Sequence, residues 1–300
     1  MSMPIDKIIS EESILNDAGF FWRERDGVKV LVCRVLEDAG FRNGFSTRLG
    51  GVSRLGSTEN ADGSADLNLA GFKDDLAENI AENRRRFFSV LDEPNELATV
   101  WQVHGDSIKI VRSLDETGDS DDRCDAMVSD LSGLFLGVKT ADCVPILIAD
   151  PATGAFAAIH AGWRGTLASI AAKAVDKMNE AFGSNPSEML CAIGPAALGC
   201  CYEVGSEVIE AFGRTLTEHR KYFHSSREGH AYIDLHQINS DQLAGAGING
   251  QNIFKAPLCT MERTDLFFSY RIENPRLGKT GRLMAVIGRN DEGRAEITLS

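Results

Sequence analysis

Thr140-Ala-Asp-Cys-Val-Pro-Ile-Leu-Ile-Ala-Asp150 and Ala155-Phe-Ala-Ala-Ile-His-Ala-Gly-Trp-Arg-Gly-Thr166 are two largely apolar stretches separated by only Pro151-Ala-Thr-Gly154. Asp150-Pro-Ala-Thr-Gly154 has the residues of a tight turn between two β-strands, because proline presets one backbone dihedral and glycine accepts positive φ. A hairpin centred on Ala152 places Cys143 opposite His160, or one residue away from it. Directly opposed side chains lie on one face with Cβ atoms ~5 Å apart, which suits two ligands of one metal ion.

His104 ends another predicted strand, Trp101-Gln-Val-His104, and is the candidate third ligand. Two imidazoles and a thiolate favour zinc, and three protein ligands leave a fourth position open for water or substrate, as in catalytic sites. The spacing leaves two alternatives open. Each residue could be structural, since a buried cysteine is usually a small hydrophobe. Cys143 and His160 could also be the nucleophile and base of a hydrolase.

Several further residues near these positions are candidates for substrate binding or catalysis. Gly162-Trp-Arg-Gly-Thr166 leads into a predicted helix, and backbone amides there with Arg164 would suit a small anion. Arg48 and Arg271 could also bind phosphate, although each could equally form an ordinary salt bridge. Asp142 adjoins Cys143 and could orient neighbouring groups or transfer a proton.

The remaining pattern alternates only loosely between strands and helices, so we expect a mixed α+β fold. An acidic stretch, 115–125, is expected to be a solvated loop, and the four histidines beyond position 200 show no ligand-like spacing and are expected on the surface. No repeat or linker divides the chain, which predicts one domain over residues 1–300. Strands are expected at 31–36, 97–103, 108–111, 134–138, 144–149, 155–159, 189–193, 266–270 and 283–287, and helices at 74–91, 166–182, 206–212 and 235–244.

Charge and cysteine usage restrict the class of protein. The formal net charge is −13, from 31 Lys plus Arg against 44 Asp plus Glu, which makes nucleic-acid or membrane partners an unfavourable match. The sequence has no apolar run long enough to cross a bilayer and no secretory signal pattern at its start. Seven cysteines, none of them in a Cys-x-x-Cys pair, predict reduced thiols and a cytoplasmic location.

Taken together, these motifs resemble the YfiH family, also described as polyphenol oxidoreductase laccase-like. The resemblance runs from Phe41 to Ile287. Its most specific blocks are Trp101-Gln-Val-His-Gly105, Thr140-Ala-Asp-Cys143 and Ile159-His-Ala-Gly-Trp-Arg-Gly-Thr166. Further matching blocks are Phe45-Ser-Thr-Arg-Leu-Gly-Gly-Val-Ser53, Leu67-Asn-Leu69, Glu82-Asn-Arg84, Gly194-Pro195, Tyr202-Glu-Val204, Phe268-Ser-Tyr-Arg271 and Thr280-Gly-Arg282.

The resemblance implies a zinc site formed by His104, Cys143 and His160. It also implies phosphorolysis of purine nucleosides (adenosine, inosine, guanosine and methylthioadenosine), with adenosine deamination in some members. The implied partners are therefore a purine nucleoside and phosphate. The implied fold has α/β/β/α layers over a core of about residues 41–290, similar to the deamidase domain of cytotoxic necrotizing factor. A longer spacer, 272–279, departs from the family pattern and leaves the substrate preference open.

Two other enzyme classes compete with this interpretation. Multicopper oxidases use many imidazoles, usually in His-x-His pairs, whereas this chain has six histidines and no such pair. Weak oxidase activity would then require copper bound adventitiously at the His-Cys-His site. A Cys-His hydrolase, such as the peptidoglycan-precursor editing known for some relatives, would use the same opposed pair.

Overall fold

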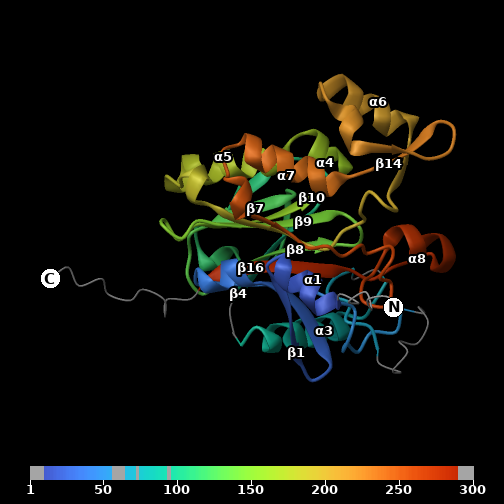
Figure 1. The fold of residues 1–300 in the computed structure, drawn as a ribbon. Coiled ribbons are helices and arrows are strands. Elements are labelled where there is room, and N and C mark those ends of the chain that lie inside the picture. Colours follow the sequence, from blue (N-terminus) through green and yellow to red (C-terminus); the bar gives the residue numbers. More distant parts are fainter. Residues whose placement is uncertain (1–9, 56–64, 72–73, 93–95, 290–300) are drawn as a thin grey trace, which may run out of the picture.

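The computed structural model describes residues 10–55, 65–71, 74–92 and 96–289. Two large β-sheets lie face to face, and helices cover their outer faces (Figure 1). Both sheets combine parallel and antiparallel strand pairs. The fold is therefore α+β with mixed sheets, as the sequence predicted.

The first sheet has seven strands in the order β1-β2-β3-β16-β8-β4-β6. Helix α3 (Ala77–Val90) packs on its outer face, where Phe87 and Val90 are buried against side chains of β2 and β16. Its strands are β1 (Phe20–Arg25), β2 (Val28–Cys33), β3 (Phe41–Ser46), β16 (Leu283–Arg289), β8 (Leu134–Thr140), β4 (Glu96–Trp101) and β6 (Gly118–Arg123), with the short helices α1 (Glu11–Asp17) and α2 (Arg34–Asp38) at this end of the chain.

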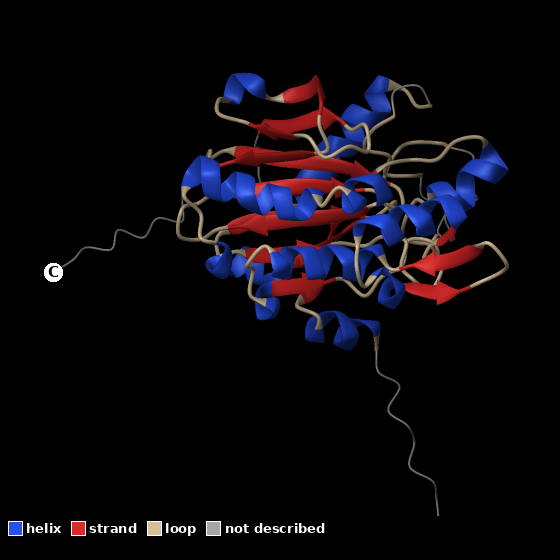
Figure 2. Ribbon diagram, turned by 90° about the horizontal axis from the view of Figure 1, so that it is seen from above, coloured by secondary structure: helices blue, strands red, loops and turns tan. Residues whose placement is uncertain are grey.

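The second sheet has six strands in the order β15-β11-β9-β10-β7-β5. Helices α4 (Trp163–Leu167), α5 (Ile170–Phe182) and α7 (Leu235–Gly245) cover its outer face (Figure 2). Its strands are β15 (Ile253–Lys255), β11 (Leu190–Ile193), β9 (Val144–Ala149), β10 (Phe156–Ala161), β7 (Ala126–Ser129) and β5 (Ile108–Ile110).

A small third sheet and several short elements complete the described chain. The sheet contains β12 (Glu203–Gly205), β14 (His230–Ile233) and β13 (Phe223–Ser225), beside helix α6 (Ser206–Thr215). Helix α8 (Tyr270–Leu277) precedes the last strand. Four single-turn 3₁₀ helices are η1 (Leu114–Glu116), η2 (Pro186–Glu188), η3 (His219–Tyr222) and η4 (Gly250–Asn252).

Strand β10 shows how the core directs His160. Side chains alternate along a strand, so Ala157 and Ile159 pack towards the helices while Phe156 and Ala158 pack between the two sheets. All six residues of β10 are buried. By the same alternation His160 belongs to the face between the sheets, at the end of the strand away from the hairpin loop.

The predicted hairpin of β9 and β10 is confirmed, but its predicted register is wrong. The ladder runs from Phe156↔Ala149 to Ala161↔Val144. The turn is therefore centred between Ala152 and Thr153 rather than on Ala152. His160 pairs with Pro145, and Cys143 lies two positions further along, which is a diagonal neighbour on the same face.

Four other predictions require correction. The strand expected at 266–270 is absent: residues 266–269 are a buried irregular segment, and α8 begins at Tyr270, because a short apolar run does not distinguish a strand from a buried loop. The stretch 115–125 contains strand β6, whose acidic side chains face solvent at a sheet edge. The strand expected at 31–36 ends at Cys33, and α2 follows it. The helix expected at 166–182 is two helices, separated at Ser169, where φ is +60°.

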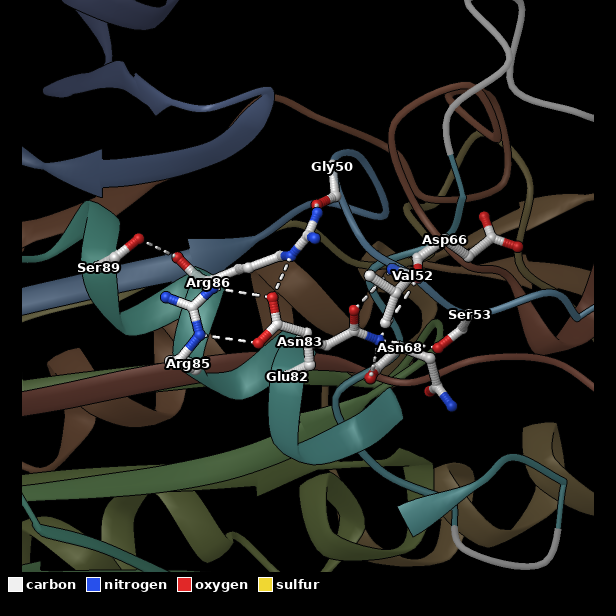
Figure 3. A network of polar contacts seen from close by, with 10 residues as sticks. All are labelled: Gly50, Val52, Ser53, Asp66, Asn68, Glu82, Asn83, Arg85, Arg86 and Ser89. Atoms are coloured by element: carbon white, nitrogen blue, oxygen red, sulfur yellow. Dashed lines mark hydrogen bonds and ion pairs between the residues drawn. The ribbon is translucent and has the colours of Figure 1, made fainter. Parts of the chain in front are cut away.

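The Glu82-Asn-Arg84 block supports the loops beside α3 (Figure 3). Asn83 is buried; its side chain donates to Ser53 Oγ (2.8 Å) and to the Asn68 carbonyl (2.9 Å), and accepts from the Val52 N–H (2.8 Å). One amide therefore joins two loops, which gives this block a structural role.

Candidate metal centre

Asp125 holds the backbone of the loop that carries His104. Its side chain is fully buried, and its carboxylate accepts the backbone N–H groups of Val103 (3.2 Å), His104 (2.9 Å) and Gly105 (2.7 Å). These hydrogen bonds fix the loop after β4. His104 adopts φ +59° there, a conformation that non-glycine residues rarely occupy. The exposed imidazole of His104 is thus held on an ordered backbone.

The same carboxylate orients His160. Asp125 Oδ1 lies 2.8 Å from His160 Nδ1, and the Asp125 carbonyl accepts the His160 N–H at 2.7 Å. A carboxylate only accepts hydrogen bonds, so Nδ1 carries the proton. Nε2 is then the imidazole atom available as a ligand. This carboxylate–histidine arrangement is the usual support of metal-binding histidines.

Cys143 completes the cluster at the start of β9. One ligand atom each from His104, Cys143 and His160 lie within 4.8 Å of one another. The two imidazole rings are 4.9 Å apart at their centroids and nearly perpendicular, at 83°. The sequence therefore identified three residues that the fold does bring together, and the described residues place all three donors around one point.

The electrostatics of the cluster favour a thiolate. Burial alone would raise the pKa of Cys143, but the charge of His160 and hydrogen bonds with both imidazoles outweigh it and lower this pKa to about 6. Burial would likewise lower the pKa of His160, yet the Cys143 charge and the Asp125 hydrogen bond raise it to about 9. A thiolate and two imidazoles form a donor set that fits a borderline-soft metal ion.

Gly162 leaves the space that the three donors share. A Cβ atom added at this glycine would lie 3.1 Å from His104 Cδ2, 3.2 Å from Cys143 Sγ and 3.8 Å from His160 Cε1. Its φ of −71° is accessible to any residue, so backbone conformation does not require glycine here. Glycine is required because the donor side chains of His104 and Cys143 approach this position so closely.

Asp142 supports the centre through its backbone and its carboxylate. The residue has φ +89° and is buried. Its carboxylate accepts from Thr260 Oγ1 (2.7 Å), Ser269 Oγ (3.0 Å) and the Arg271 N–H (2.8 Å). Burial raises its pKa, and these three hydrogen bonds oppose that shift. Asp142 directly precedes Cys143, so these hydrogen bonds connect the start of the Cys143 strand to the start of α8.

The three candidate arginines differ in their surroundings. Arg48 is buried between two carboxylates, Asp66 at 2.9 Å and Glu273 at 2.7 Å, and its guanidinium stacks on Phe268. Of the two roles that the sequence left open for Arg48, this is the arrangement of a structural ion pair.

Arg164 and Arg271 are exposed and lie beside aromatic rings. Arg164 belongs to α4, directly after Gly162, and stacks 4.2 Å from the Trp163 centroid. Arg271 stacks 4.6 Å from the Tyr202 centroid and donates to the Glu203 carbonyl. Burial and the Cys143 charge raise the pKa of Tyr202, so the Tyr202–Arg271 pair lies within electrostatic reach of the cluster.

Asp125 was the principal omission of the sequence analysis. It lies at the end of the acidic stretch, where the preceding residues 121–123 are exposed. The available signal was its position directly before the apolar Ala126-Met-Val128, since the residue that opens a buried strand is itself close to the core. His236, expected on the surface, is instead buried and bonded through Nε2 to the Gly194 carbonyl at 2.7 Å.

Comparisons with known proteins agree on one family. The family model described as "Multi-copper polyphenol oxidoreductase laccase" matches residues 42–290. The purine nucleoside phosphorylase YfiH of Escherichia coli is 33% identical over 262 residues, covering 86% of this chain and 98% of the relative. Adenosine deaminase RL5, from an unknown prokaryotic organism, is 30% identical over 233 residues, covering 75% and 88%.

The fold agrees with that of a solved relative. The crystal structure of YlmD from Geobacillus stearothermophilus superposes with a TM-score of 0.80 at 32% identity, over 91% of this chain and 99% of YlmD. The family model and the relatives both span most of the chain. The chain therefore belongs to the YfiH family of multi-copper polyphenol oxidoreductase laccase-like proteins.

Proposed function

We propose that this protein is a zinc-dependent purine nucleoside phosphorylase, with adenosine deamination as a second activity of the same site. The observation that carries the proposal is the convergence of His104, Cys143 and His160 within 4.8 Å, with Asp125 fixing two of them. Relatives named purine nucleoside phosphorylase and adenosine deaminase support the same substrate class.

Zinc, when bound by these three side chains, would supply Lewis acidity and lower the pKa of a bound water. The residues around it do the positioning. Asp125 keeps Nε2 of His160 directed at the site, and Gly162 keeps the space between the donors open. In the phosphorolytic reaction the bond from C1′ to the purine breaks, a bond from C1′ to a phosphate oxygen forms, and the base leaves with a proton.

Phosphate would be bound by Arg164 and Arg271. Both guanidinium groups are exposed and backed by aromatic rings, and a planar guanidinium binds phosphate oxygens in pairs. Arg48 is assigned to the ion pairs with Asp66 and Glu273. Asp142 is assigned a positioning role, because its carboxylate already receives three hydrogen bonds.

The decisive experiment measures the dependence on phosphate. Purified protein should consume inosine or adenosine only when phosphate is present, apart from deamination, and should release ribose 1-phosphate and free base. His104→Gly removes the imidazole while accepting the positive φ, so it should abolish both zinc binding and phosphorolysis. His224→Ala, at an exposed histidine of β13, is the matched control. Turnover that followed copper loading and oxygen uptake would contradict the proposal.

A Cys-His hydrolase is the second candidate, and one observation favours it. The ligand atoms of Cys143 and His160 lie within 4.8 Å of each other, and the pKa of Cys143 is lowered to about 6 while that of His160 is raised to about 9, as for a thiolate beside an imidazolium. His104 argues for the phosphorylase instead, since a catalytic dyad needs no second imidazole at 4.9 Å from the first.

Alkylation resolved by peptide mass spectrometry separates these two candidates. If zinc occupies the site, Cys143 should react slowly until a chelator is added, and activity should fall as it reacts. Zinc restored before alkylation should restore turnover. A nucleophilic Cys143 would react readily in the metal-free protein without needing any ion for activity. Full activity of a metal-free His104→Gly protein would decide for the hydrolase.

The protein is also proposed to work in the cytoplasm on small molecules rather than on nucleic acid or membranes. All seven cysteines carry free thiols, which supports a reducing compartment. Among the described helices, none combines the length and apolar character needed to cross a bilayer.

A further inference from the structure

A second group of metal-binding side chains lies outside the His104–Cys143–His160 centre. It consists of Cys200, Cys201, Cys259 and Glu262, whose ligand atoms all lie within 4.8 Å of one another. The two adjacent thiols approach to 3.2 Å between their sulfur atoms. None of these residues was assigned a role by the motifs described above. We call this group the thiol cluster.

Main-chain contacts bring the two segments of the thiol cluster together. Cys200 and Cys201 lie in the turn between β11 and β12, and Cys259 lies in the loop after β15. Ala196 and Cys259 form a parallel bridge, and the Thr260 N–H donates to the Ala196 carbonyl at 3.0 Å. The Leu198 N–H also points at Cys259 Sγ, at 3.5 Å. The donors are therefore preorganised by main-chain contacts.

The burial of the four residues suits a site that a metal ion can enter. Cys259 is buried and forms the base, Cys201 is half-buried, and Cys200 and Glu262 are exposed at the opening. Around tetrahedral zinc, with Zn–S bonds of about 2.3 Å, neighbouring sulfur atoms are ~3.8 Å apart. The observed separations allow that geometry with small side-chain rotations.

Neither packing nor disulfide formation accounts for the thiol cluster as well as metal binding does. An ordinary disulfide between adjacent cysteines has poor geometry, and any single disulfide among three cysteines leaves one thiol over. A packing role does not explain why a carboxylate and an exposed thiol join a buried one.

We propose that Cys200, Cys201, Cys259 and Glu262 form a second metal site, selective for a thiophilic divalent cation of the zinc and cadmium type. Binding one M²⁺ converts three thiols to thiolates, releases three protons, and adds the carboxylate of Glu262 as the fourth donor. The bound complex carries a net charge of −2 from these groups and the ion together.

The thiol cluster is connected to the first centre through Asp142. Thr260, next to Cys259, donates to Asp142 Oδ1 at 2.7 Å, and the Ala197 N–H donates to the Asp142 carbonyl at 2.9 Å. Asp142 directly precedes Cys143. A metal in the thiol cluster would therefore clamp the two loops that hold this aspartate, and its role would be structural.

Cadmium titration tests the proposal independently of the first centre. In a metal-stripped His104→Gly/Cys143→Ser protein, the first centre lacks two of its three donors. This protein should still bind one equivalent of Cd²⁺, with thiolate-to-cadmium absorption in the ultraviolet and release of close to three protons. Adding Cys259→Ser to this protein should abolish the binding of this equivalent of Cd²⁺. Adding Cys124→Ser, which changes a half-buried thiol outside both groups, should leave Cd²⁺ binding unchanged.

Further variants keep the test decisive if Cys259→Ser fails to fold. Cys200→Ser changes an exposed side chain and should also remove the cadmium absorption. Native mass spectrometry of the unsubstituted protein should show two metal ions per chain. Retention of the cadmium equivalent in both serine variants would overturn the proposal, and so would a disulfide within the thiol cluster in protein purified under reducing conditions. Failure of phosphorolysis alone would not affect it.

Discussion

At the scale of single residues, Asp125 fixes the geometry of the candidate metal centre. One buried carboxylate accepts three consecutive backbone N–H groups and the Nδ1 proton of His160. It also belongs to the segment that leads into β7, which lies between β10 and the edge strand β5 in the second sheet. The loop of His104 and the ring of His160 are therefore held by the same carboxylate.

We expect Asp125→Asn to weaken zinc binding by ~10–100-fold, the usual effect of losing the partner of a metal-binding histidine. The amide removes the negative charge and replaces one acceptor atom with a donor that faces backbone N–H groups. Competition with a chromophoric chelator measures the change. Asp122→Asn, the same substitution at an exposed aspartate nearby, should leave zinc affinity unchanged.

We expect Gly162→Ala to disrupt the centre while preserving the fold. The added methyl group would lie 3.1 Å and 3.2 Å from atoms of His104 and Cys143, so the donors must separate. The backbone tolerates alanine at φ −71°. Zinc content should fall, and the thermal midpoint of the metal-free protein should stay close to that of the metal-free parent. Gly245→Ala, where nothing lies within 4 Å, controls for the substitution.

His104, Cys143 and His160 could be singled out from the sequence because each lies at or just beyond a predicted strand and within a motif block of the family that the chain resembles. The role of Asp125 could not be predicted, because hydrogen bonds to a loop backbone leave no periodic pattern in the sequence. The register error at Cys143 and His160 has a similar cause. A turn of four residues rather than five moves the hairpin centre by half a position, and composition does not distinguish the two.

At the scale of elements, strand β6 shows how an acidic segment can belong to a sheet. Its sequence, Gly-Asp-Ser-Asp-Asp-Arg, has no apolar residue, yet it pairs with β4 in parallel. Asp119 provides the attachment: it accepts two hydrogen bonds from Arg84 of α3, at 2.9 and 3.0 Å, and one from Thr99 of β4, at 2.6 Å. Hydrophobic patterning cannot detect a strand held in this way.

We expect Asp119→Asn to destabilise the protein by about 1 kcal/mol or less at neutral pH, since the ion pair is partly screened by solvent. Partial burial opposes ionisation, but the Arg84 and Thr99 hydrogen bonds dominate and lower the pKa of Asp119. A lowered pKa in the folded state stabilises above the unfolded pKa of about 3.9, and that contribution is lost as pH falls through the folded value.

Urea unfolding at several pH values checks this prediction. The difference in unfolding free energy between the parent and Asp119→Asn should be largest near neutral pH and should close as the pH falls below the unfolded pKa of about 3.9. Asp121→Asn, on the same strand and exposed, should show no such dependence. A difference that persisted in acid would mean that the hydrogen-bond geometry, not the charge, holds β6.

At the scale of the whole molecule, the metal centre and the main sources of stability are separate. Three groups of buried apolar side chains lie under the outer helices of the second sheet, between the two sheets, and under α3. The strand and helix pattern predicted a mixed α+β fold, and the layered arrangement was implied by the resemblance to the YfiH family. The pattern did not predict which strands meet at the edges, because those pairings join segments far apart in the chain.

The separation can be tested by damaging each part in turn. Phe87 of α3 is fully buried under the first sheet. Phe87→Ala should lower the free energy of unfolding by ~3–5 kcal/mol and the melting temperature by on the order of 10 °C, through loss of burial and an unfilled cavity. Zinc content and phosphorolysis, measured well below the melting temperature, should remain at the parent level.

Stripping the metal from the parent protein should do the reverse. Activity should disappear, while the far-ultraviolet circular dichroism and a cooperative melt persist, because none of the three apolar groups depends on the ion. The melting temperature should fall only by the amount that mass action dictates and should rise again with the logarithm of added zinc. If the metal-free protein instead lost its cooperative transition, the centre would be part of the folding nucleus, and the assignment of stability to the layered core would be wrong.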